Sequence, residues 1–284
     1  MDKKALPVEA LENPYEEIAG HLPNEVGVGG ALITMVEPDL GFEHAYNRWY
    51  EDDHFYAGAM VGPWMFSGRR WVATRDLQSL RFPKDSPVAQ PVTAGAYIST
   101  YWITAGHFDD AERWGQVAMS KHLYPNGRGF DHRQHVYTAF SNYDFGAARP
   151  DLTRLRPEHA LDHPFAGMVV EVIEPDAKTD RGKLLAALRD QVIPAALTMP
   201  LALAMAFTSR PMQSSGPMPP RVGQPFGVGR ALTLLWFVQA DPRTCWSLFR
   251  THTEAIARVG GKLVFAAPFV PTIVGTDTYV DELR

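Results

Sequence analysis

The feature that most constrains the fold of this 284-residue chain is an internal repeat. The segment ALITMVEPD at 31–39 returns as MVVEVIEPD at 168–176, with Glu, Pro and Asp at a common offset of 137 residues. At the same offset, Asp53 matches Asp190 and Pro63 matches Pro200. Self-similarity over such a long period predicts that one supersecondary unit is built twice in this chain.

Both halves are predicted to contain the same succession of strands and helices, from their hydrophobic periodicity and their Gly and Pro breaks. In the first half we expect strands at 32–36, 67–74, 97–104 and 135–141, with helices at 42–60 and 109–123. In the second half we expect strands at 168–173, 201–208, 231–238 and 263–270, with helices at 180–197 and 242–259. The order βαββαβ is that of a ferredoxin-like unit. A four-stranded sheet with helices on one face leaves its other face apolar, so the two halves should cover each other in an α+β fold.

These elements divide the chain into an N-terminal extension (1–27), a first half (28–150), a linker (151–163) and a second half (164–284). The stretch 211–229 is dense in Pro and Gly and is expected to be a long loop, a candidate lid.

Composition excludes several classes of function. Hydrophobic residues make up 45% and charged residues 21%, which is typical of a globular protein. A net charge of -5 argues against a nucleic-acid partner, because phosphate binding requires a surplus of Lys and Arg. The lone cysteine excludes an internal disulfide, and no apolar run reaches the length of a membrane span. With no signal peptide visible, we expect a cytoplasmic protein.

The first predicted helix carries the most informative side chains. Tyr46, Tyr50 and His54 follow one another at helical spacing, i, i+4 and i+8. Histidine titrates near neutrality, and a phenol can stabilise a developing oxyanion, so this stripe could form an acid/base site. The alternative is that the rings are ordinary packing residues of an amphipathic helix, with their polar tips satisfied locally.

The residues RWYEDDHF, followed by GPWMFSGRRWV, resemble the EthD-like branch of the dimeric α+β barrel superfamily. The resemblance covers residues 31–75 closely and the remaining chain only in architecture. It implies an internal dimeric α+β barrel with a pocket for a small, apolar, often aromatic molecule, and a functional role for His54. In the second half, Ala187 and Gln191 stand where Tyr50 and His54 stand, so only the first half would keep the site.

Further polar and aromatic residues of the first half could serve the same pocket. On the predicted last strand, His135 and Tyr137 should share a face, because side chains alternate. Arg69 and Arg70 should point to opposite faces of their strand, so that at most one serves the pocket. The residues expected to line or bind the substrate are Tyr46, Trp49, Trp64, Trp71, Arg69 and Tyr137.

The sequence contains no pattern for a metal or nucleotide cofactor. HxH, HExxH and cysteine clusters are absent, Gly27–Gly30 precedes a strand instead of following one, and GxSxG does not occur.

From these observations we predict a cofactor-independent, lyase- or isomerase-type enzyme that acts on an apolar, oxygenated, aromatic or polyketide/terpenoid-like molecule. His54 would be the general acid or base, with Tyr50 and His135 as further catalytic groups. A cofactor-free monooxygenase and a non-catalytic small-molecule binding protein are the alternatives. We expect no cofactor, no metal, no nucleic acid and no membrane partner. The internal pseudo-dimer leaves homodimerisation open.

Overall fold

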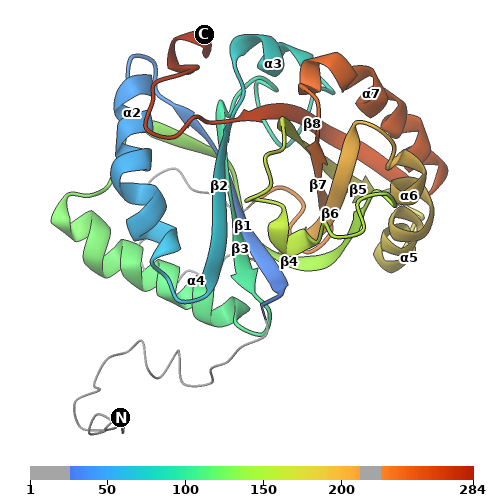
Figure 1. Ribbon diagram of the computed structural model, residues 1–284, viewed down its shortest axis with the longest axis horizontal. Helices are drawn as coiled ribbons and strands as arrows, with labels where there is room; N and C mark the ends of the chain where they lie inside the picture. The colour runs from blue at the N-terminus through green and yellow to red at the C-terminus, as the bar shows by residue number, and fades with distance from the viewer. Residues whose placement is uncertain (1–25, 212–224) are drawn as a thin grey trace, which may run out of the picture.

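Eight antiparallel strands close into a barrel in the computed structural model, which describes residues 26–211 and 225–284 (Figure 1). The first-half strands are β1 (Val28–Pro38), β2 (Met65–Val72), β3 (Tyr97–Thr104) and β4 (Arg133–Ala148). The second-half strands are β5 (Gly167–Pro175), β6 (Leu201–Ser209), β7 (Leu232–Val238) and β8 (Gly261–Pro271). The order β4-β1-β3-β2 of the first half recurs as β8-β5-β7-β6, which confirms the predicted fold class. Most of the N-terminal extension and of the candidate lid lies outside the described residues.

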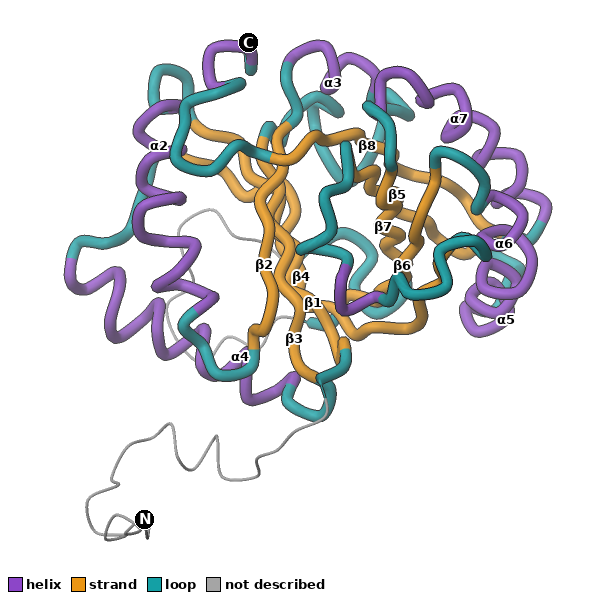
Figure 2. Tube along the Cα trace, in the orientation of Figure 1, coloured by secondary structure: helices purple, strands orange, loops and turns teal. Residues whose placement is uncertain are grey.

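The helices lie outside the barrel, and each half has its own set (Figure 2). In the first half, α2 (Glu43–Trp49) continues as the π-helical turns η2 (Tyr50–His54) and η3 (Tyr56–Met60). The second helix of this half, α4 (Phe108–Val117), continues as η4 (Ala118–Leu123) and η5 (Tyr124–Asn126). The second half has α5 (Arg181–Ala187), η7 (Leu188–Val192), α6 (Ile193–Ala196) and α7 (Pro242–Arg258). The remaining short helices are α3 (Arg75–Leu80), η6 (Pro157–His159) and η8 (Val280–Glu282). None of the described helices is long and apolar enough to cross a bilayer.

Strand alternation separates the barrel interior from the layer under the helices. On β3, Trp102 points inward and packs against Phe207 and Phe237 of the second half, with ring centroids 5.4 and 6.5 Å away. Its neighbour Tyr101 points outward, where its ring lies 5.4 Å from that of Phe55. The barrel interior is therefore a core shared by both halves, whereas the space between sheet and helices belongs to each half separately.

The two halves meet at two joints of unequal length. At one, β2 pairs with β8 at Trp71–Pro271 and Val72–Val270. At the other, β4 is 16 residues long, and its second part pairs with β6 from Ser141–Ser209 to Ala148–Leu203. This extension exceeds the predicted strand 135–141: Tyr143 and Phe145 continue its alternation, and the pairing with β6 holds the segment extended.

A close approach brings the first helical segment onto the sheet of the first half. A side chain at Gly68 of β2 would clash with Met60, Tyr101 and Phe55, at 2.6, 2.7 and 3.1 Å. The missing Cβ therefore lets the π-helical turns carry Phe55 and Met60 directly onto β2 and β3.

Candidate functional site

The predicted stripe on the first helix is present and faces the sheet. The rings of Tyr46 and Tyr50 are 5.6 Å apart, and those of Tyr50 and His54 are 5.2 Å apart. The Tyr50 hydroxyl, however, hydrogen-bonds the Tyr101 hydroxyl at 2.8 Å. Tyr50 thus ties the helix to the sheet and is not the group that orients His54.

His54 is enclosed by packing on its helix. Its ring stacks on Trp49 with centroids 4.1 Å apart, and Gly58 lies against its other atoms. Its Nδ1 is buried and has no hydrogen-bond partner among the described residues. A buried nitrogen without a partner is costly, so a site of this kind calls for an explanation beyond packing.

His135 faces the same layer and is held by two threonines. Its Nδ1 lies 2.7 Å from the Thr138 hydroxyl and 3.4 Å from that of Thr34, and the two hydroxyls are 2.8 Å apart. The Arg133 Nε donates to His135 Nε2 at 3.4 Å. Because Nε2 accepts, the network assigns the proton to Nδ1 and leaves a lone pair on Nε2.

Tyr137 does not join His135, so the predicted shared face is wrong. A register shift between Met35 and Val36 marks a bulge in β4 that inserts Val136 between the two side chains. Tyr137 consequently points into the barrel, where its hydroxyl lies 3.1 Å from that of Thr233 on β7.

Arg133 is a buried cation at the centre of this cluster. Its guanidinium donates to the Phe130 carbonyl and, at 2.8 Å, to the Tyr124 hydroxyl, and its Cζ lies 4.6 Å from the ring centroid of Trp49. No carboxylate in the described part of the chain forms an ion pair with it. An unpaired buried charge is expensive, which favours an anionic group as its natural complement.

The electrostatics keep both imidazoles neutral. Burial, reinforced by Arg133, lowers the pKa of His135 to about 3. Burial likewise lowers the pKa of His54 well below its usual value, with Arg133 and His135 adding to the effect. Neutral imidazoles are available as metal ligands or as proton acceptors at physiological pH.

The other residues expected to line a pocket are dispersed. Trp71 is fully buried in the barrel and donates to the Thr100 hydroxyl at 3.3 Å. Arg69 also points to the barrel side, where it donates to the carbonyls of Leu161 and His163 at 3.1 and 2.7 Å. Trp64 stacks on His107 with centroids 3.5 Å apart. These three side chains therefore lie away from His54, whereas Tyr46 and Trp49 lie beside it.

Arg133 was missed by the sequence analysis, although a signal for it exists. It stands two residues before His135, a spacing that places both on one face of a strand. The predicted strand began at 135 and so excluded it.

The second half has a different arrangement under its helices. On η7, the position of His54 is taken by the exposed Gln191. Deeper in the layer, the Glu171 carboxylate accepts from the Trp236 indole at 2.7 Å and lies 3.0 Å from His252 Nδ1. This buried carboxylate has a partner on each oxygen, so the arrangement is complete without a ligand.

Comparisons with known proteins agree on the fold alone. No family model and no curated protein matches the sequence. Among solved structures, a protein assigned as a chlorite dismutase matches with a TM-score of 0.50 and 15% identity, covering 91% of this chain and 100% of its own. A heme-bound arginine-to-leucine variant of DypB from Rhodococcus jostii RHA1 matches with a TM-score of 0.50 and 12% identity, covering 86% and 93%.

The prediction of cofactor-independent acid/base chemistry is wrong. The structures of this fold that match over nearly the whole chain include a protein in complex with heme. The geometry also removes the expected Tyr50–His54 and His135–Tyr137 pairs. What the topology and the matched structures establish is the architecture: this chain has the fold of the dimeric α+β barrel superfamily, with both ferredoxin-like halves in one polypeptide.

Proposed function

We propose that the protein is a heme-binding enzyme whose cofactor is held by the first half. The observation that carries the proposal is one cluster of two neutral imidazoles, His54 and His135, around the buried Arg133, which has no ion pair in the described part of the chain. Heme is a planar apolar group with an iron that takes histidine ligands and with anionic propionates.

The donor set fits this group. His135 donates Nδ1–H to Thr138, which fixes the ring. Its Nε2 lone pair, which accepts from Arg133 Nε, would become available for iron once Arg133 turned to a propionate. Arg133 supplies the positive charge that a propionate requires, and its geometry suits a carboxylate better than that of a lysine would. His135 would therefore be the axial ligand and Arg133 the anchor for a carboxylate.

Access would come from the side where aromatic rings are partly exposed. Trp49, Tyr124 and Phe130 are each half-buried, and the Trp49 ring lies 5.3 Å from that of Phe130. Trp49 stacks on His54 and lies over Arg133, so its indole must move aside before a macrocycle reaches the imidazoles.

A histidine-ligated heme supplies redox chemistry, such as peroxide-dependent oxidation, when it is bound. The contribution of the chain is to exclude water with the aromatic rings and to keep an unprotonated nitrogen at His54 Nδ1. That nitrogen has no competing partner among the described residues, so it can accept a proton from a molecule that binds beside it.

The test is titration of the purified protein with hemin, followed by the Soret absorbance. We expect saturable binding at one hemin per chain, weakened at least tenfold by His135→Ala and by Arg133→Met. Exposed neighbours provide matched controls: His132→Ala and Arg128→Met remove the same side-chain types and should leave the titration unchanged. Absence of saturable binding, or equal binding by all four variants, would refute the proposal.

A further inference from the structure

A second polar group in the first half also lacks partners. Arg70 of β2 is 4% exposed, and its Nη1 donates to Asn47 Oδ1 at 3.0 Å and to Glu51 Oε1 at 2.8 Å. Its Nε and Nη2 are buried and have no hydrogen-bond partner among the described residues. These two nitrogens form one edge of the guanidinium plane, the edge that binds both oxygens of a carboxylate in parallel.

Two tyrosine rings pack against this guanidinium. The Arg70 Cζ lies 4.6 Å from the ring centroid of Tyr50 and 4.9 Å from that of Tyr97. The Tyr97 hydroxyl is itself buried and has no hydrogen-bond partner in the described chain. Three buried donors near these rings, Arg70 Nε, Arg70 Nη2 and the Tyr97 hydroxyl, therefore have no partner in the described chain. A buried donor left without a partner costs free energy.

The local charge is suited to an anion. Glu51 neutralises Arg70, but its second oxygen is already occupied by the Gly275 N–H at 2.9 Å. Arg133 adds a positive charge that acts on Tyr46 together with Arg70. The first-half layer thus holds more buried positive than negative charge at these groups, and one carboxylate would balance it.

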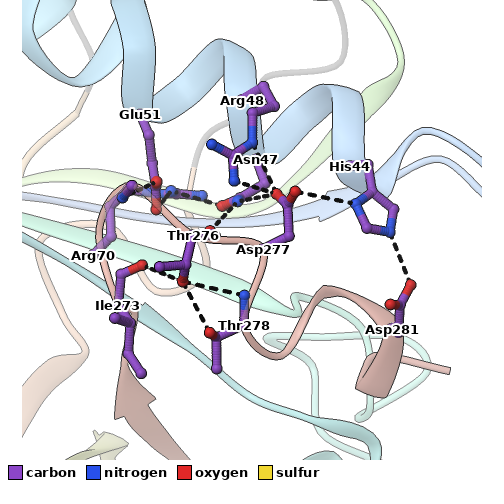
Figure 3. A network of polar contacts seen from close by, with 11 residues as sticks. His44, Asn47, Arg48, Glu51, Arg70, Ile273, Thr276, Asp277, Thr278 and Asp281 are labelled. Carbon is purple, nitrogen blue, oxygen red and sulfur yellow. Dashed lines mark hydrogen bonds and ion pairs between the residues drawn. The ribbon is translucent and has the colours of Figure 1, made fainter.

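The C-terminal segment covers this group (Figure 3). Asn47 donates to the Thr276 carbonyl at 3.0 Å and to Asp277 at 3.1 Å, and Arg48 donates to Asp277 at 2.9 Å. Farther out, His44 hydrogen-bonds Asp281 at 2.8 Å. Figure 1 shows this segment crossing from β8 to α2, so the second half supplies the cover for a site in the first. Its outer ion pairs, of Asp277 with Arg48 and of Asp281 with His44, are exposed and individually weak.

We propose that the Nε/Nη2 edge of Arg70 and the Tyr97 hydroxyl form a binding site for the carboxylate of a small aromatic acid. The edge supplies the two parallel hydrogen bonds, the hydroxyl a third, and the rings of Tyr46, Tyr50 and Tyr97 contact the aromatic part. This site does not depend on heme, because neither His135, the proposed iron ligand, nor Arg133, the proposed propionate partner, forms its hydrogen bonds.

The test is isothermal titration of the heme-free full-length protein with benzoate, and with benzyl alcohol as a probe of the same shape without charge. We expect benzoate to bind and benzyl alcohol not to bind. Arg70→Lys keeps the charge but removes the two-nitrogen edge, and it should abolish measurable binding. His135→Ala removes the proposed iron ligand but keeps the charges of Arg70 and Arg133, and it should retain benzoate binding, which separates this site from the heme proposal.

A milder variant keeps the test valid if Arg70→Lys fails to fold. Tyr97→Phe removes only a hydroxyl that has no partner in the described chain, so its fold should be intact, and we expect benzoate affinity to fall about tenfold or more. Tyr143→Phe, at a half-buried tyrosine elsewhere, should change nothing. No benzoate binding by the wild type would show that the edge holds water only. Equal affinity of wild type and Tyr97→Phe would equally overturn the proposal.

Discussion

The two halves share one strand order and the same π-helical turn in the first helix, yet the layers beneath their helices differ in polarity. In the first half, His54 Nδ1 and the Arg70 edge lack hydrogen-bond partners among the described residues, and Arg133 has hydrogen bonds but no ion pair there. In the second half, Glu171 is fully buried and both of its oxygens have a partner, Trp236 on one and His252 on the other. The second half has unpartnered buried atoms as well, Arg181 Nε and Ser209 Oγ, but in the described chain they are fewer than those of the first half.

The comparison also shows what does not mark function in this fold. A π-helical turn occurs at 50–54 and again at 188–192, where it presents the exposed Gln191. Such turns are often found at functional sites, but here the turn belongs to the repeat. The unpaired polar atoms, not the backbone irregularity, distinguish the first half.

The largest expected effect comes from removing the buried carboxylate of the second half. Glu171→Ala would leave His252 and Trp236 without their acceptor and open a cavity, so we expect the free energy of unfolding to fall by about 3–5 kcal/mol in urea denaturation. Glu171→Gln, which keeps the volume and one acceptor oxygen, should lose clearly less. A loss below about 1 kcal/mol in the alanine variant would mean that the network is not a structural element.

A smaller effect is expected from acid, and it comes from the first half. The folded-state pKa of His135, about 3, lies below the ordinary value near 6.5. The unfolded chain therefore binds more protons, and the stability contributed by neutral His135 is present above about pH 6.5 and is lost as pH falls toward 3. Between pH 7 and pH 5 we expect His135 to account for a loss of about 1–2 kcal/mol, measured by urea denaturation at each pH.

Matched variants at two histidines identify the source of this dependence. His135→Gln should remove only its own share of the decline between pH 7 and pH 5, because the pKa of His54 is lowered too, whereas His132→Gln, at an exposed neighbour, should leave the decline unchanged. An identical pH profile in His135→Gln and wild type would show that another group controls the acid sensitivity.

The smallest expected effect tests whether Arg133 contributes less to the free energy of unfolding than another buried arginine does. Arg133 is a buried cation without a carboxylate in the described chain, and it donates to one backbone carbonyl, that of Phe130, and to the Tyr124 hydroxyl. We therefore expect Arg133→Met to lower the free energy of unfolding by no more than about 1–2 kcal/mol. Arg81 is also buried, but it donates to the carbonyls of Thr93, Ala94 and Gly95 at 3.1, 2.7 and 2.8 Å. Arg81→Met should therefore lower the free energy of unfolding more than Arg133→Met does, as measured by urea denaturation. Equal losses in the two variants would contradict the comparison.

The architecture was accessible from the sequence because the repeat and the apolar periodicity act over whole elements. The strand 97–104 and the helix 242–259 were predicted to within a residue. The second part of β4 was not, although Tyr143 and Phe145 continue its alternation, because its pairing partner β6 comes from the other half of the chain.

The candidate site was predicted less well, for a physical reason. Spacing along a helix identified the stripe of Tyr46, Tyr50 and His54, but hydrogen-bond partners depend on residues brought in by the fold. Tyr101 takes the Tyr50 hydroxyl, and a single bulged residue, Val136, sends Tyr137 to the opposite face from His135. Neither event has a signature in the local sequence.

The most direct test of the central claim is a crystal structure of the protein loaded with hemin. Our account predicts heme in the first half, with iron ligated by His135 Nε2, a propionate near Arg133, and Trp49 moved away from His54. Heme bound in the second half, or on the outer surface with His54, Arg133 and His135 unchanged, would contradict it.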